Sequence, residues 1–171
     1  MFKFLLPALA AAALAATPAA AQQRTNSNFT GPRIEVNAGV EDVTNSRRNF
    51  NDVTYGAAIG ADGALGDRFT LGGEVSVSNP LDDTGRQFGA AARLGYALDR
   101  NVLAFGRVGY TNVDIDGLQN IEEANLEGLT LGGGVNFALT PNLYTSVEYR
   151  YTDFEHNIGS HGARVGVGLR F

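Results

Sequence analysis

The chain of 171 residues contains no cysteine, so it can form neither a disulfide framework nor a thiolate metal site. Lys3 is its only lysine, and apart from the two histidines every other basic residue is an arginine. Beyond residue 21, no apolar run approaches the roughly 18 residues that a membrane-spanning helix needs. The net charge of −5 disfavours nucleic acid as a partner, because nucleic-acid binding needs a clustered basic face.

The first residues follow the plan of a secretory signal peptide. Lys3 supplies a positive charge, residues 4–16 form a short apolar run, and the alanines at 19–21 suit cleavage before Gln22. The run is too short for a transmembrane helix. We therefore expect three parts: a signal peptide at 1–21, an N-terminal lead-in at 22–31 and one folded domain at 32–171.

Within this domain, apolar residues recur at every second position in eight segments. This period is typical of β-strands that have one apolar face and one small or polar face. Segments of about 9–11 residues are long enough to cross a bilayer when tilted. The fifth is the least regular, because Leu103 and Phe105 fall on its polar face. The segments are 33–41, 54–63, 68–78, 87–97, 102–112, 128–138, 143–152 and 161–171.

The connections alternate between short and long. The short ones repeat an Ala-Leu pair followed by turn residues, at 64–68, 97–101 and 138–142. The long ones cover 42–53, 79–86, 113–127 and 153–160. Short turns at one end and long loops at the other are typical of outer-membrane barrels, with the turns in the periplasm. The sequence therefore predicts an all-β fold, an eight-stranded antiparallel up-and-down transmembrane β-barrel.

The charged residues of the strands fall on the face opposite the apolar one. A soluble ligand-binding barrel would show the reverse pattern. An arginine facing lipid at the bilayer midplane costs roughly 2–4 kcal/mol, so these side chains are expected to face the lumen. They are Arg33, Glu35, Asp62, Glu74, Arg93, Arg107, Glu148, Arg150, Arg164 and Arg170. Interior glycines are expected to make room for the guanidinium groups, at Gly60, Gly72, Gly95, Gly109, Gly132 and Gly166.

Buried charges need partners, and arginine suits this because its planar fork engages a carboxylate. A simple hairpin register sets Arg33 opposite Asp62 and places Glu74 near Arg93 and Arg107. An eight-stranded lumen is only wide enough for side chains to fill, which favours a narrow lumen plugged by charge. The alternative is a small-solute or ion porin whose pore is lined by these charges.

The aromatic residues of the apolar face form two groups. With strand directions taken from the loops, one group lies near the outer rim and the other near the periplasmic rim. Such belts are typical of membrane barrels. The outer group is Tyr55, Phe88, Tyr110, Tyr149 and Tyr151, and the periplasmic group is Phe69, Tyr96, Phe137 and Phe171.

The long loops are acidic, which is compatible with a solvated rim, with divalent bridges to lipopolysaccharide or with a basic partner. Their carboxylates are Asp42, Asp52, Asp82, Asp83, Asp114, Asp116, Glu122, Glu123, Asp153 and Glu155, against Arg47, Arg48 and Arg86. The four carboxylates at 114–123 match no EF-hand spacing, so no metal site is predicted.

One group of residues has the composition of an acyl-transfer site. It contains His156, His161, Ser160 and Glu155, and a Ser-His-carboxylate set is the minimum for that chemistry. The His-x-Ser motif of barrel-type lipid A deacylases is absent, so surface-loop histidines are the simpler interpretation. A lipid A-modifying enzyme is the weaker alternative. We expect no enzymatic activity and no catalytic, cofactor-binding or metal residues.

The chain resembles the outer-membrane β-barrel domain family of small porin-like and opacity-type surface proteins from Gram-negative bacteria. The resemblance covers residues 31–171 and is carried by four motifs: Arg-Leu-Gly-Tyr at 93–96, Arg-Val-Gly-Tyr at 107–110, Glu-Tyr-Arg-Tyr-Thr-Asp at 148–153 and Val-Gly-Val-Gly-Leu-Arg-Phe at 165–171.

This resemblance implies an outer-membrane location and a structural or surface-interaction role, with no shared catalytic residues. It also implies three kinds of partner. They are outer-membrane lipid with lipopolysaccharide, the barrel-assembly machinery reading the terminal strand at Phe171, and a host or surface ligand bound by the loops.

Overall fold

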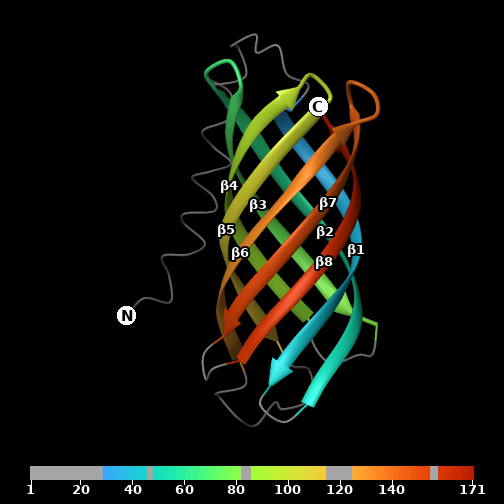
Figure 1. Cartoon of the computed structure of the whole chain (residues 1–171), viewed down its shortest axis with the longest axis vertical. Helices are drawn as coiled ribbons and strands as arrows, with labels where there is room; N and C mark the ends of the chain where they lie inside the picture. The colour runs from blue at the N-terminus through green and yellow to red at the C-terminus, as the bar shows by residue number, and fades with distance from the viewer. Residues whose placement is uncertain (1–28, 46–47, 82–85, 115–124, 155–157) are drawn as a thin grey trace.

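The computed structural model describes residues 29–45, 48–81, 86–114, 125–154 and 158–171. Each strand in this part pairs antiparallel with the next, and the last pairs with the first, so the sheet closes into a barrel (Figure 1). No helix in the described residues is long and apolar enough to cross a membrane. The strands are β1 (Gly31–Asn45), β2 (Arg48–Leu65), β3 (Phe69–Pro80), β4 (Arg86–Asp99), β5 (Val102–Asp114), β6 (Asn125–Ala138), β7 (Leu143–Phe154) and β8 (Ile158–Arg170).

The predicted eight-stranded antiparallel barrel is confirmed, but the strands run further toward the long loops than the apolar alternation indicates. β2 has 18 residues, and its hairpin with β1 stays paired as far as Asn45 and Arg48. Most of 42–53, expected as a loop, is therefore strand. Alternation of hydrophobicity ends where the side chains leave the apolar layer, whereas backbone hydrogen bonding continues beyond it.

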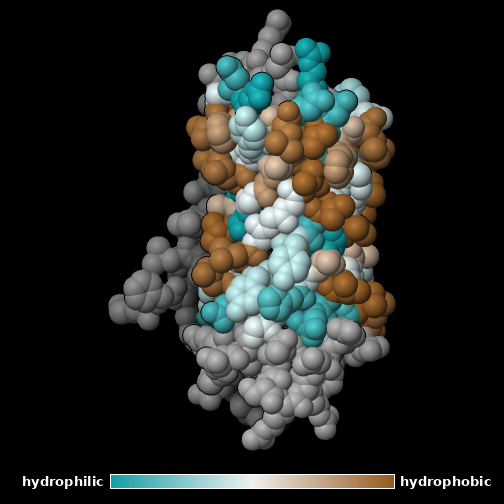
Figure 2. All heavy atoms as spheres, in the orientation of Figure 1, coloured by the Kyte–Doolittle hydropathy of each residue, from teal (hydrophilic) through white to brown (hydrophobic). Residues whose placement is uncertain are grey.

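The outer face of the barrel carries large apolar side chains, which the other described residues leave exposed. In β8, Val165 is 60% exposed while the neighbouring Arg164 is 7% exposed. Figure 2 shows the same arrangement over one side, where a hydrophobic belt lies between hydrophilic zones at the two ends of the described surface. A wall with large apolar side chains outside and charges inside suits lipid as the surrounding solvent.

The aromatic side chains of this face lie outside the barrel in two belts, as predicted. Phe69 and Tyr96 are directly opposite each other on β3 and β4, with ring centroids 4.9 Å apart. They belong to the periplasmic belt, with Phe137 and Phe171. Tyr55 and the other residues of the outer belt lie further along their strands toward the long loops and face outward.

The barrel closes at the periplasmic end through the two ends of the described chain. The backbone N–H of Phe171 donates to the carbonyl of Pro32 at 2.9 Å. The preceding Gly31 has a φ of 111°, a backbone conformation that residues with a side chain rarely adopt. Its Cα lies against the carbonyl of Phe171. The glycine thus allows β1 and β8 to meet without a Cβ between them.

Candidate functional site

The lumen is the most chemically distinctive part of the molecule. Its charged side chains are buried, and those of Arg33 and Asp62 are each 1% exposed. An eight-stranded barrel is just wide enough for inward-facing side chains to fill it, so charges from opposite walls come into contact. The buried charged residues of the described lumen are Arg33, Glu35, Glu41, Asp62, Glu74, Arg93, Arg107, Glu148, Arg150, Arg164 and Arg170.

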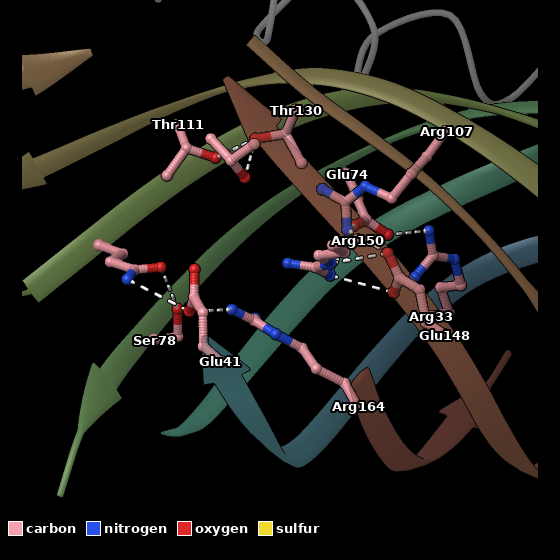
Figure 3. Close-up of polar contacts among 12 residues, drawn as sticks. Arg33, Glu41, Glu74, Ser78, Arg107, Thr111, Thr130, Glu148, Arg150 and Arg164 are labelled. Carbon is pink, nitrogen blue, oxygen red and sulfur yellow. Dashed lines mark hydrogen bonds and ion pairs between the residues drawn. The ribbon is translucent and has the colours of Figure 1, made fainter. Parts of the chain in front are cut away.

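A network of ion pairs crosses the middle of the lumen, with Glu74 at its centre (Figure 3). Glu74 accepts from Arg33 Nη2 at 2.6 Å and lies 2.5 Å from Arg107 Nη1. Glu148 accepts from Arg150 through both oxygens, at 2.7 and 3.1 Å, and lies 3.3 Å from Arg107. Because these residues belong to β1, β3, β5 and β7, the network ties alternate strands together across the barrel.

The ion pair expected between Arg33 and Asp62 is present, with Nε 3.0 Å from Oδ2, but the expected register is wrong. Arg33 lies opposite Gly60, and Asp62 lies opposite Gly31. The difference is two residues, which keeps every side chain on the same face of the sheet. The long arginine side chain therefore still reaches Asp62 diagonally.

Arg93 differs from the other arginines of the lumen. The expected proximity of Glu74 to Arg107 is an ion pair, but Arg93 pairs with no carboxylate among the described residues. Its guanidinium carbon instead lies 3.6 Å from the ring centroid of Phe105. This cation–π contact explains why an aromatic residue interrupts the polar face of β5.

The glycines expected to make room for guanidinium groups lie against an arginine side chain at two positions, against the guanidinium at Gly60 and against the aliphatic stem at Gly132. A Cβ at Gly60 would lie 3.1 Å from Arg33 Nη2, and a Cβ at Gly132 would lie 2.9 Å from Arg107 Cγ. The other four lie close to different groups. Those are Asp62 beside Gly72, Thr70 and Leu103 beside Gly95, Ala91 beside Gly109, and Ser146 and Glu35 beside Gly166.

The periplasmic end of the lumen is filled by an apolar cluster that the sequence did not reveal. Phe29 and Leu103 are fully buried and pack with Ala97. The guanidinium carbon of Arg170 lies 5.7 Å from the Phe29 ring centroid and 5.3 Å from that of Tyr144. Phe29 falls in the N-terminal lead-in expected at residues 22–31, because a single aromatic residue before the first strand shows no two-residue periodicity.

The extracellular half of the lumen is lined by hydroxyl groups around Glu41. Its carboxylate accepts from Ser160 at 2.7 Å and from Gln87 at 3.4 Å. It also accepts from Arg164 at 3.5 Å (Figure 3). A separate chain of hydroxyls joins Thr111, Thr130 and Thr152 across three strands, at 2.8 and 3.1 Å. The space among these side chains is about 10 Å³, enough for roughly one water molecule.

Of the residues considered for acyl transfer, the structure describes Ser160 and His161, and these two do not come together. Ser160 faces the lumen and donates to Glu41, whereas His161 faces outward and its Nδ1 lies 2.6 Å from the Tyr149 hydroxyl. The sheet separates the two side chains. His156 and Glu155 lie outside the described residues. So do the loop carboxylates Asp82, Asp83, Asp116, Glu122 and Glu123, and the described part contains no cluster of three or more metal-ligating residues.

A closed barrel with a lipid-facing belt and a charged lumen defines a transmembrane β-barrel. The chain matches the family model described as the outer membrane protein beta-barrel domain over residues 8–171. It therefore belongs to this family, and it is an outer-membrane protein.

Comparison with individual proteins supports this assignment. The chain is 34% identical over 83 residues to the 25 kDa outer-membrane immunogenic protein of Brucella ovis, a match that covers 47% of this chain and only 40% of that protein. Its structure is similar to that of Ail, the attachment invasion locus protein of Yersinia pestis, in complex with the heparin analogue sucrose octasulfate. That match has a TM-score of 0.61 and 14% identity, and covers 83% of this chain and 99% of Ail.

The outer-membrane enzyme PagL is also similar in structure. The TM-score is 0.50 and the identity 15%, with 80% of this chain and 99% of PagL covered. At such identities the likeness shows the fold alone. Since an attachment protein and an enzyme share it, function must be argued from this chain's own residues.

Neighbouring glycines of β6 provide a test of the lumen packing. We expect Gly132→Val to lower the free energy of unfolding by about 1–3 kcal/mol, because the new side chain would overlap Arg107 and Glu148. Gly133→Val is the matched control, since a Cβ there faces outward and would meet only the Phe105 carbonyl, at 3.5 Å. Urea unfolding in lipid vesicles measures the free energy of unfolding of both variants. Equal losses of stability in the two would contradict the packing described.

Proposed function

We propose that this outer-membrane protein has a structural or surface-interaction role and that its lumen is closed to ions. The observation that carries the proposal is the ion-pair network around Glu74. Charges paired across a lumen this narrow occupy the path that an ion would take. A conducting pore needs a continuous water-filled path, which these contacts interrupt.

Closure is supported at three levels of the barrel. The hydroxyl-lined region around Glu41 leaves space for about one water molecule. The ion pairs fill the middle. The apolar cluster of Phe29, Leu103 and Ala97 covers the periplasmic end. With the interior filled, the parts free to meet a partner are the loops and the outer face.

The acidic loops are the proposed surface-interaction region. Described carboxylates near this rim include Asp153 and Glu127, which are both exposed. The loop carboxylates between residues 113 and 127 add to this charge. A rim with a net negative charge favours a basic partner or divalent bridges to lipopolysaccharide, and such attraction weakens as salt is added.

Export and assembly complete the proposal. Residues 1–21 act as a signal peptide, residues 22–31 lead into the barrel, and the terminal strand is read by the barrel-assembly machinery. The side chain of Phe171 supports this last step, because it is 73% exposed at the end of the apolar face of β8.

The closed lumen makes a prediction about conductance. We expect the purified wild-type protein to give no stable single-channel conductance in planar bilayers. The double variant Phe29→Ala and Glu74→Gln should give reproducible openings, because it removes the aromatic cover and the charge shared by several arginines.

The control for this measurement is Glu127→Gln, which neutralises one carboxylate on the outer surface and should give no single-channel conductance. A heat-dependent gel-mobility shift confirms that each variant is folded. A stable conductance from the wild-type protein would contradict closure and favour the porin alternative.

The surface role predicts that loop charge matters for adhesion. We expect a variant with Asp114→Asn, Asp116→Asn, Glu122→Gln and Glu123→Gln to bind cultured epithelial cells several-fold less well when displayed on bacteria. The control is Asp67→Asn with Asp99→Asn, which neutralises exposed carboxylates of the periplasmic turns. Equal adhesion by wild type and the loop variant would leave a structural role as the better description.

We also propose that the protein is not an enzyme. Ser160 and His161 lie on opposite faces of the sheet, so they cannot form a catalytic pair. We expect mass spectra of lipid A to be identical from cells that express the wild-type protein, the His156→Ala/Ser160→Ala variant or neither. Loss of an acyl chain only in the presence of the wild-type protein would overturn this.

A further inference from the structure

The outer surface of β2 to β5 contains an apolar hollow of about 500 Å³. This volume falls within the roughly 300–1,000 Å³ of small-molecule sites. The hollow forms because the small Ala57 and Ala90 lie among larger side chains, with Val77 opposite Ala57 and Tyr110 opposite Ala90. Its outward-facing residues form two adjacent rows of cross-strand neighbours, Ala57–Val77–Phe88–Asn112 and Ile59–Val75–Ala90–Tyr110.

A polar group lies at one end of this hollow. The first row continues onto β6 at Glu127, which lies directly opposite Asn112. Asn112 Nδ2 donates to Glu127 Oε1 at 3.4 Å, and the Tyr110 hydroxyl donates to Oε2. Glu127 is exposed. The apolar hollow therefore ends at a carboxylate that two of its own lining residues hold in place.

The strand tilt orients this arrangement with respect to the membrane. Ala57 lies eight residues from the periplasmic end of β2, whereas Glu127 lies eleven residues from that of β6. The row thus climbs toward the extracellular rim as it passes from β2 to β6. Its apolar end lies deeper and its polar end lies nearer the surface, which is the orientation of a lipid in the outer leaflet.

We propose that this hollow binds one acyl chain of lipopolysaccharide, with Glu127 accepting a hydrogen bond from a sugar hydroxyl or amide N–H of the headgroup. The inference deepens the lipid partnership proposed above by giving it a site. Against lipid there is no hydrophobic driving force, so a chain in the hollow gains mainly van der Waals contact. Selectivity comes from the rim, because the Glu127 carboxylate only accepts hydrogen bonds. Sugar hydroxyls and amide N–H groups of lipopolysaccharide can donate to it, whereas a phosphatidylcholine headgroup has no donor.

The chain contains no tryptophan, so a single introduced tryptophan reports on its own surroundings. Phe88→Trp places the reporter on the wall of the hollow, and Val40→Trp places a control on the outward face of β1, outside it. Both are reconstituted in vesicles of brominated phosphatidylcholine, which quenches tryptophan. Added lipopolysaccharide should relieve quenching of Phe88→Trp at a roughly tenfold lower mole fraction than for Val40→Trp.

Two further variants in the Phe88→Trp background test the parts of the site. Ala57→Leu with Ala90→Leu fills the hollow but keeps the lipid-facing surface apolar, and Glu127→Ala removes the acceptor. Each variant should abolish the preference of the Phe88→Trp site for lipopolysaccharide over phosphatidylcholine. The proposal is overturned if the two reporters respond alike, if either variant keeps the preference, or if phosphatidylglycerol relieves quenching as well as lipopolysaccharide does. This measurement depends on neither conductance nor adhesion. Its failure would overturn the lipopolysaccharide site without contradicting the proposed function.

Discussion

The carboxylate of Glu74 lies among three arginines from three different strands, and the rest of the lumen is arranged around this contact. Arg33 and Arg107 approach it at 2.6 and 2.5 Å, and Arg150 approaches it at 3.9 Å. Taking ions out of water costs several kcal/mol each, and only close pairing compensates for that cost. The barrel is narrow enough to supply the pairing, because side chains of opposite walls meet in the middle.

The other features of the interior follow from this requirement. Arg107 and Glu148 can meet beside β6 because Gly132 has no side chain there. Arg93, which has no carboxylate partner among the described residues, lies against the face of Phe105. A ring face offers a guanidinium weaker electrostatic stabilisation than a carboxylate does, but stacking on it needs no second charge. The lumen therefore combines two ways of holding a buried cation.

Much of this arrangement could be predicted from the sequence, because each strand separates two very different environments. Lipid selects apolar residues on one face and the packed lumen selects small or charged residues on the other, so period two identifies both. The ion pair of Arg33 and Asp62 was predicted correctly even though the predicted register of β1 and β2 was wrong by two residues. A shift of two residues keeps each side chain on the same face of the sheet.

Other features leave no periodic signal. Phe29 precedes the first strand, and only the closed barrel shows that it covers the periplasmic end of the lumen. The extension of β1 and β2 toward the loops depends on backbone hydrogen bonds, which do not constrain side-chain polarity. The pairing of Arg93 with Phe105 also depends on the distance between two adjacent strands rather than on spacing within either one.

These constraints decide where the protein has room for recognition. A closed barrel has no free strand edge, so a partner cannot add a strand to it. In the closed barrel that we propose, a ligand meets either the loops or the outer wall. On that wall, large apolar side chains alone would present the same surface to every lipid. Selectivity requires a depression beside a polar group, and Ala90 with Glu127 provides that combination where the wall meets the outer rim.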